Sequence, residues 1–417
     1  MRYAGIASSF PLLLLFAAVT AQGRDPAWVG SWEAAQLIAE SENAVPRDSL
    51  HDATLRQIVH LSAGGSRLRL RISNAFGAGP LHLSAVHVAR AVSPASGRIE
   101  PASDRAVTFN ERADVVIPAG AEYTSDPLEF STAPRSSLAI TVQVEAAPDR
   151  QTGHPLSRAT SYLATGAPVS AAELQSARPL DHWWFLSGVE VATSAQSAAI
   201  VTLGDSITDG DGATTNANDR WPDVLAARLQ SAPAAQGTAL LNAGIAGNRL
   251  LTDGFGPNAL ARFDRDVLAQ SGVRYLIVLE GINDIGMLTR GASASEAQHE
   301  DLVRRMIGAY RQITMRARAH GIRVIGATLL PFMGSTYYHP GQANESDRQI
   351  INAWIRAPGH FDAVIDFDRL AADPASPDHL RADYDSGDHL HPSPAGYRAM
   401  GEAVPLDLFA PAPSGHR

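Results

Sequence analysis

The chain has 417 residues, of which 45% are hydrophobic and 18% charged. This length suggests two or three domains, and the composition is that of a globular protein with a buried core. The formal net charge is -9 and no long basic run accompanies it, which argues against a nucleic-acid partner. The chain has no cysteine, and this excludes disulfides, a thiol nucleophile and thiolate metal sites.

Residues 1–21 have the pattern of a secretory signal peptide. Arg2 supplies the positive start, residues 10–19 the apolar segment, and Val19-Thr20-Ala21 a small-residue cleavage site. The apolar stretch is too short for a transmembrane helix, so we expect no stable membrane insertion. Export without cysteine fits a bacterial route, and we therefore expect a secreted or periplasmic bacterial protein.

Short alternating segments separated by turn signals occupy residues 24–192. Residues 68–72 (LRLRI) alternate apolar and charged side chains, as a half-buried strand does, and residues 137–144 repeat the pattern. Turn signals such as Gly64-Gly65 and Ala133-Pro134-Arg135 bound these runs. We expect an accessory domain here, built as an antiparallel, jelly-roll-like β-sandwich.

Strands and helices alternate over residues 198–410, after a polar connector at 193–197. The strands are expected at residues 199–203, 239–242, 275–280, 323–329 and 363–367. Residues 301–320 carry the clearest amphipathic stripe, and Gly321 stands where a helix is expected to end. This alternation predicts an α/β domain, with a parallel sheet covered by helices on both faces.

Gly204-Asp205-Ser206 follows the first apolar run of this domain. The run predicts a buried parallel strand that leads into a tight turn. α/β folds place their ligand sites at the carboxyl ends of such strands. Ser206 is therefore a candidate nucleophile, with a helix amino terminus behind it. The tripeptide alone is a weak signal, and three later segments give it weight.

One of these later segments is Asp388-x-x-His391. A serine hydroxyl needs a base to accept its proton and a group to orient that base. His391 is the candidate base, and Asp388 lies three residues before it, close enough to fix the ring tautomer. His389 is expected to be a surface or packing residue. A metal site made of His379, His389 and His391 is the alternative, but a serine triad needs no metal and we expect none.

Three groups are candidate donors to the oxyanion that such a reaction forms. They are the backbone N–H of Ser206, the backbone N–H of Gly247 and the side-chain amide of Asn283. A glycine permits the close backbone approach that an oxyanion hole requires. Gly244 is the alternative to Gly247, and Asn283 in isolation is equally typical of a turn.

The four segments, in this order, resemble the four blocks of the SGNH hydrolases, also called GDSL esterases and lipases. The resemblance covers residues 199–405. It implies that Ser206 is the nucleophile, that Ser206, Gly247 and Asn283 form the oxyanion hole, and that Asp388 and His391 complete the triad. It also implies a three-layer α/β/α fold and ester hydrolysis without a cofactor.

Two carboxylates belong to the same blocks without a place in the chemistry. We expect Asp205 and Asp284 to hold loops by hydrogen bonds instead of acting as acids. The amino-terminal half, with motifs at 28–32 and 72–77, is similar to exported bacterial SGNH proteins that carry an added β-domain. Four tryptophans of this half either stack on sugar rings or anchor the core: Trp28, Trp32, Trp183 and Trp184.

These observations favour a secreted serine ester hydrolase. Its expected substrates are short-chain, acetyl-type esters carried by a small molecule or a polysaccharide. The alternative is a lipolytic esterase or a phospholipase-type acylhydrolase, which a preference for longer acyl chains would reveal. A non-catalytic carbohydrate-binding protein is the third hypothesis, although every triad and oxyanion position is filled.

Overall fold

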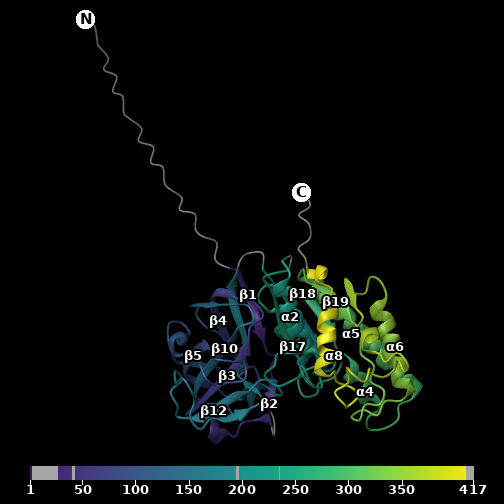
Figure 1. The fold of residues 1–417 in the computed structure, drawn as a ribbon, viewed down its shortest axis with the longest axis horizontal. Helices are drawn as coiled ribbons and strands as arrows, with labels where there is room; N and C mark the ends of the chain where they lie inside the picture. The colour runs from purple at the N-terminus through teal and green to yellow at the C-terminus, as the bar shows by residue number, and fades with distance from the viewer. Residues whose placement is uncertain (2–26, 40–42, 194–196, 234, 410–417) are drawn as a thin grey trace.

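The computed structural model describes Met1 and residues 27–39, 43–193, 197–233 and 235–409. The predicted signal peptide lies outside these residues except for Met1. Figure 1 shows a body of strands, purple to blue, beside a body of mixed strands and helices, teal to yellow. We call Ala27–Thr193 the β-rich region and Ala198–Phe409 the α/β domain.

Three antiparallel sheets make up the β-rich region. Its strands are β1 (Ala27–Glu33), β2 (Leu37–Ala39), β3 (Ala53–His60), β4 (Gly65–Ser73), β5 (Leu81–Arg90), β6 (Arg105–Val107), β7 (Val115–Ile117), β8 (Glu122–Thr124), β9 (Leu128–Thr132), β10 (Ser137–Ala146), β11 (Gln151–His154), β12 (Ser161–Thr165), β13 (Arg178–Leu180), β14 (Trp183–Trp184) and β15 (Leu186–Thr193). Two short 3₁₀ helices, η2 (Arg47–Leu50) and η3 (Pro101–Ser103), join them.

The two larger sheets of this region form a sandwich. Their strand orders are β1-β15-β4-β8, with β9 beside β4, and β13-β12-β3-β10-β5-β6, with β7 beside β5. Apolar side chains from both sheets share one buried core, to which Leu55, Leu70, Val86, Ile140 and Val189 belong. The third sheet, β14-β11-β2, is small and carries His154 at the end of β11. The antiparallel β-sandwich predicted from the alternating pattern is therefore confirmed.

The α/β domain is built on one parallel sheet. Its strands are β16 (Ala198–Gly204), β17 (Thr238–Gly244), β18 (Val273–Leu279), β19 (Arg323–Ala327) and β20 (Ala363–Ile365). Its helices are α1 (Ser206–Asp209), α2 (Trp221–Ser231), α3 (Ala259–Phe263), the π-helical turn η4 (Asp264–Leu268), α4 (Ile282–Thr289), α5 (Glu296–Ala319), α6 (Gln342–Arg356), α7 (Phe367–Ala371), α8 (Pro394–Ala403) and the 3₁₀ turn η5 (Leu406–Phe409).

The strand order of this sheet fixes where its site lies. The order is β17-β16-β18-β19-β20, and every neighbouring pair is parallel. The order reverses beside β16, and α/β sheets bind ligands at the carboxyl ends of the strands at such a reversal. Helix α2 packs with α8, and α5 packs with α3 and α6 (Figure 1). Ser206 follows the end of β16 by two residues, so the candidate nucleophile lies at the carboxyl end of the strand beside which the order reverses.

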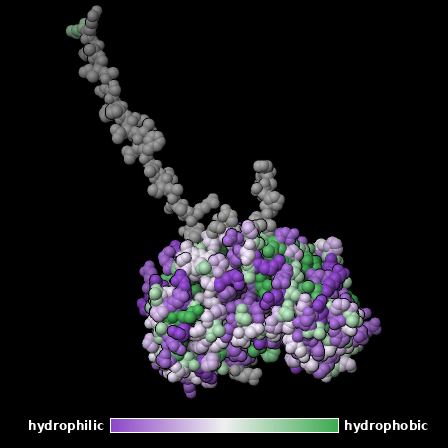
Figure 2. Space-filling model, in the orientation of Figure 1, coloured by the Kyte–Doolittle hydropathy of each residue, from purple (hydrophilic) through white to green (hydrophobic). Residues whose placement is uncertain are grey.

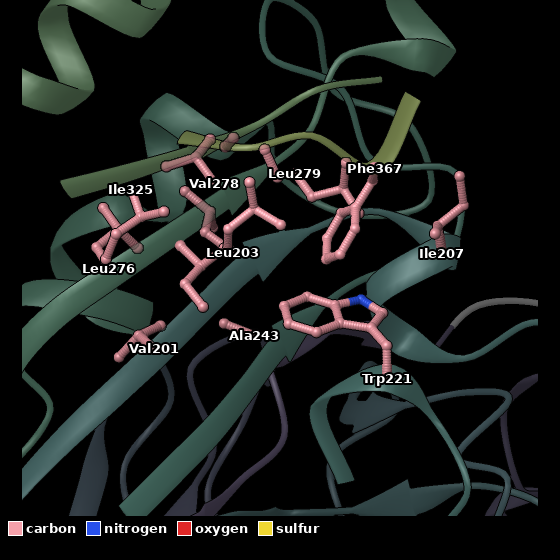
Figure 3. Close-up of a cluster of buried hydrophobic side chains, with 14 of the residues drawn as sticks. Val201, Leu203, Ile207, Trp221, Ala243, Leu276, Val278, Leu279, Ile325 and Phe367 are labelled. Carbon is pink, nitrogen blue, oxygen red and sulfur yellow. The ribbon is translucent and has the colours of Figure 1, made fainter. Parts of the chain in front are cut away.

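The core of the α/β domain covers β16, an interior strand of the sheet, on both faces. All seven residues of β16 are buried, as a strand covered on both faces requires. Figure 3 shows Leu203 of β16 close to Val278 of β18, its partner in register. In the same view the indole of Trp221 lies against the ring of Phe367, with centroids 5.5 Å apart.

Two of the boundaries that differ from prediction have a clear local cause. The helix predicted at 301–320 begins earlier, at Glu296, because Ser295 and Gln298 form a capping box before the apolar stripe starts. The last predicted strand, 363–367, ends at Ile365, because the side chain of Asp366 accepts a hydrogen bond from the Arg369 N–H and starts α7.

The β-rich region and the α/β domain share an apolar interface. Val29, Leu37 and Ala63 of the β-rich region belong to the same buried cluster as the core of the α/β domain. The Ser62 hydroxyl accepts a hydrogen bond of 2.9 Å from the backbone N–H of Leu240 in β17. The β-rich region is therefore packed directly on the sheet that carries the candidate site.

The visible surface mixes polar and apolar side chains without one dominant apolar face (Figure 2). Among the described residues, we find no helix with the length and apolar character needed to cross a membrane.

Candidate active site

Three neighbouring strands deliver the predicted site residues to one edge of the sheet. Gly204, the last residue of β16, is paired in register with the last residues of β17 and β18, Gly244 and Leu279. Ser206 begins α1 just after β16, while Gly247 and Asn283 follow β17 and β18. The loop before α8 supplies His391 from the far end of the chain, 185 residues from Ser206.

A chain of hydrogen bonds joins Asp388, His391 and Ser206. The Nε2 atom of His391 lies 2.8 Å from Ser206 Oγ, and its Nδ1 atom lies 2.5 Å from Asp388 Oδ2. The other carboxylate oxygen, Oδ1, accepts the backbone N–H groups of Leu390 and His391 at 2.9 and 2.8 Å. The Asp388 carboxylate therefore fixes both the ring and the backbone of the loop that carries it.

The electrostatics of this chain favour a charged carboxylate and a basic imidazole. Burial raises the pKa of Asp388, but the hydrogen bond and charge of His391 and two backbone amides lower it by more. The net pKa therefore lies well below the usual value for aspartate. Burial lowers the pKa of His391, yet Asp388 and Asp211 raise it by more. Asp211 Oδ2 stands 3.8 Å from His391 Nε2, on the side facing Ser206.

Asp205 and Asp284 hold loops, as predicted. The Asp205 carboxylate accepts the N–H of Ile207 at 2.9 Å and so caps the short helix that Ser206 begins. The Asp284 carboxylate accepts the N–H groups of Leu250 and Leu251 at 2.8 and 3.1 Å. Desolvation by burial is the largest cause that raises the pKa of Asp205 to about 7 and that of Asp284 to about 6.

The backbone N–H groups of Ser206 and Gly247 are available as donors. Within the described part of the chain neither donates a hydrogen bond to another group. Gly247 has φ +69°, a conformation that favours glycine, and a Cβ there would meet the ring of Phe255 at 2.7 Å. Gly244, the alternative donor, is already engaged, because its N–H binds Asn242 Oδ1 at 2.9 Å. Its missing Cβ lets the turn at Asp209 approach, since a Cβ would lie 2.3 Å from the Asp209 nitrogen.

Asn283 is oriented by a residue that sequence reasoning missed. Its Nδ2 donates to the carbonyl of Asn248 at 2.7 Å, and its Oδ1 accepts from the hydroxyl of Tyr338 at 2.6 Å. Tyr338 is 3% exposed and its ring lies against Gly286, where a Cβ would come within 2.4 Å. One amide N–H of Asn283 is thus committed to the loop, and the second can serve a ligand.

Arg262 is a second residue that the sequence did not reveal. Its guanidinium is fully buried and donates to backbone carbonyls at the carboxyl ends of two strands, those of Gly204 at 2.9 Å and Ala243 at 2.6 Å. It also donates to Asn248 Oδ1 at 2.9 Å and lies 3.9 Å from the Glu280 carboxylate. Arg262 therefore fastens together the ends of β16, β17 and β18 below the candidate site.

The remaining predicted residues lie apart from this chain of hydrogen bonds. The His389 side chain is about half exposed and pairs with Asp385 at 2.5 Å, as expected of a surface residue. His379 is similarly exposed and pairs with Asp378 at 2.7 Å. In the described ranges no group of three or more histidine, aspartate or glutamate side chains is arranged to hold a metal ion.

Three of the four tryptophans are core residues and do not form a sugar-stacking surface. Trp32, Trp183 and Trp184 are each less than 9% exposed. Trp32 and Trp183 pack edge to face with centroids 4.9 Å apart. Trp28 is half-buried, and the guanidinium of Arg69 covers its ring at 4.5 Å.

Solved structures similar to the chain cover about half of it. A protein of the G-D-S-L family from Desulfitobacterium hafniense is 22% identical over 49% of this chain and 97% of its own, with a TM-score of 0.37. A GDSL-like lipase from Bacteroides thetaiotaomicron is 20% identical over 49% of this chain and 84% of its own, with a TM-score of 0.36. A variant acetyl xylan esterase from Geobacillus stearothermophilus is 19% identical over 52% and 97%, with a TM-score of 0.37. No curated protein matches the chain.

The family match falls on the residues that form the site. The model of the GDSL-like Lipase/Acylhydrolase family matches residues 202–399, from the end of β16 to α8. This range includes every residue predicted for the triad and the oxyanion hole. The α/β domain therefore belongs to the GDSL-like lipase/acylhydrolase family, and the chain is a hydrolase that acts on esters.

Proposed function

We propose that the protein is a serine carboxylic ester hydrolase with Ser206, His391 and Asp388 as its catalytic triad. The observation that carries this proposal is the continuous hydrogen-bonded chain from Asp388 through His391 to Ser206, at 2.5 and 2.8 Å. A serine held in this way can lose its proton to the imidazole as it attacks a carbonyl carbon.

The proposed reaction has two halves. Ser206 Oγ attacks the ester carbonyl while His391 Nε2 takes its proton, and the N–H groups of Ser206, Gly247 and Asn283 stabilise the oxyanion. The tetrahedral intermediate collapses, and His391 returns the proton to the departing alcohol. Water then attacks the acyl-enzyme with His391 as base, releases the carboxylic acid and restores the Ser206 hydroxyl.

We propose short-chain, acetyl-type esters on carbohydrate as the substrates. The rim of the site supports this, because a charged pair lies beside His391: Asp211, 3.8 Å from its Nε2 atom, and Arg158, the ion-pair partner of Asp211. Such a rim suits a hydroxyl-rich alcohol better than a long acyl chain. The second candidate is lipolysis, which the 64% exposed ring of Phe255 beside Gly247 favours.

Two further parts of the proposal concern the chain as a whole. We propose that residues 1–21 are a signal peptide and that the enzyme is exported, on the strength of the charged, apolar and small-residue pattern there. We also propose 24–192 as an accessory domain and 198–410 as the catalytic domain, with the change from antiparallel to parallel sheets as support.

The function is tested by turnover and by covalent labelling. We expect hydrolysis of p-nitrophenyl acetate, a steep fall in kcat/KM towards the butyrate and octanoate esters, and release of acetate from acetylated xylan. An organophosphate that phosphorylates active serines should label Ser206, as peptide mass spectrometry would show. A higher kcat/KM for the octanoate ester would favour the lipolytic function. A label on another serine, with no turnover of any ester, would exclude both the carbohydrate esterase and the lipolytic function.

The acid limb of the pH profile should reflect His391. The groups that face it are Asp388, Asp211 and Asp205, and they raise its pKa above the ordinary histidine value despite burial. Because only the neutral ring can accept the Ser206 proton, kcat/KM should fall as the pH drops through this raised pKa, above about 6.5. Asp211→Asn should move the limb to lower pH, since it removes one negative charge beside the ring. A limb that stays in place in this variant would contradict the assignment.

A further inference from the structure

The segment at the end of β11 joins the β-rich region to the turn after the nucleophile. His154, the last residue of β11, is 3% exposed and places its Nε2 atom 3.0 Å from Asp209 Oδ1. Asp209 ends the short helix α1 that Ser206 begins, and it is 4% exposed. A buried hydrogen bond therefore connects two residues that belong to different regions of the molecule.

The two partners of His154 favour its protonated form. Its Nδ1 atom lies 2.8 Å from the carbonyl oxygen of Ala35, and a carbonyl can only accept, so Nδ1 carries a proton. Its Nε2 atom faces an oxygen of the Asp209 carboxyl group, and a proton on Nε2 would make the ring an imidazolium cation paired with a carboxylate. Burial and the charge of Arg220 lower the pKa of His154, but Asp209 and Ala35 raise it by more.

Asp209 links His154 to residues 245–248, which we call the oxyanion loop because they include Gly247. While Oδ1 binds His154, its Oδ2 accepts the backbone N–H of Ala246 at 3.1 Å. Ala246 immediately precedes Gly247, whose free N–H points to a role in the oxyanion hole. The backbone of Gly244 lies against the same turn, so the position of Asp209 determines where this loop can lie.

We propose that His154 is a positioning residue of the oxyanion hole: through Asp209 it fixes the backbone N–H of Ala246, one residue before the Gly247 donor, so that the β-rich region completes the active site of the α/β domain. The inference rests on the proposed function, because it assigns Gly247 a donor role. A donor displaced by a fraction of an ångström loses much of its stabilisation of the transition state, whereas substrate binding in the ground state changes little.

The test separates this positioning role from a general effect on domain packing. We expect His154→Ala and Asp209→Ala to lower kcat for p-nitrophenyl acetate by about 10- to 100-fold, with KM changed less than about twofold. Asp209→Asn should stay within about threefold of the parent kcat, because its amide nitrogen can donate to a neutral His154 while its one remaining oxygen accepts from the Ala246 N–H.

Ser62→Ala is the matched control. It removes another buried hydrogen bond between the two regions, from Leu240 to Ser62, without touching the oxyanion loop. Thermal unfolding of every variant shows whether it is folded. A kcat loss in Ser62→Ala as large as that in His154→Ala would overturn the inference, as would full kcat in a folded His154→Ala variant.

Two further outcomes also test the role of His154. If His154→Ala does not fold, a loss in Asp209→Ala that Asp209→Asn does not share supports the inference, and equal losses in the two Asp209 variants overturn it. A parent protein without ester hydrolysis would instead contradict the proposed function, independently of the comparison among variants.

Discussion

Replacing Ser206 with alanine should lower kcat for p-nitrophenyl acetate by about four orders of magnitude or more. The variant keeps the oxyanion donors and the imidazole, but it has no oxygen to form the acyl-enzyme. His391 Nε2, which lies 2.8 Å from the Ser206 hydroxyl in the parent, loses its proton donor. Steady-state kinetics at high enzyme concentration measures the residual rate, and the organophosphate label should be lost with it.

Ser231→Ala provides the comparison for this substitution. Ser231 is exposed at the end of α2, where its hydroxyl donates to the Ala227 carbonyl of the same helix. We expect its kcat and its melting temperature to match those of the parent. A folded Ser206→Ala variant that keeps more than about one hundredth of the parent kcat would show that another group is the nucleophile.

Most of the fold was predictable because its signals are local. Each parallel strand is a short apolar run that ends at a turn signal, and all five predicted strands are present, within a few residues of their predicted ends. The start of α5 was not predictable from its stripe, because its first turn faces solvent and only the Ser295–Gln298 capping box marks it. The alternation of apolar and polar residues likewise predicted β4 and β10, but it did not predict which of the two larger sheets each strand would join.

The candidate site was predictable as a set of blocks, and the structure brings these blocks together. Ser206, Gly247 and Asn283 each follow a strand end closely, so parallel pairing alone gathers them at one edge. Asp388 and His391 were suggested by a spacing of three, which the structure closes with a hydrogen bond of 2.5 Å. The roles of these residues stay a prediction until the variants are measured.

The residues that support the site were not predictable, because their partners are distant in sequence. Tyr338 and Asn283 are 55 residues apart, and so are His154 and Asp209. A lone tyrosine or histidine is equally consistent with an ordinary core position. Arg262 carries even less signal, since it lies in a short helix of ordinary composition and only tertiary structure buries it among three strand ends.

The second large effect is expected at Asn283. Asn283→Ala should lower kcat by about 100- to 1000-fold with little change in KM, because the amide stabilises charge that develops only in the transition state. Steady-state kinetics on p-nitrophenyl acetate separates the two constants. An Asn283→Ala variant with normal kcat and a raised KM would mean that the amide binds the substrate equally well before and during the reaction.

Two companion variants distinguish the donor from its support. Asn283→Asp keeps the shape of the side chain but replaces the donor with a negative charge, so we expect a loss at least as large as in Asn283→Ala. Tyr338→Phe removes only the hydroxyl that donates to Asn283 Oδ1 at 2.6 Å, and it keeps the ring packed against Gly286. The amide then retains its bond to Asn248 but loses its second restraint, so kcat should fall by only about 3- to 10-fold. If Tyr338→Phe cost as much as Asn283→Ala, the hydroxyl itself would have to contact the reacting ester, and Asn283 would be its support.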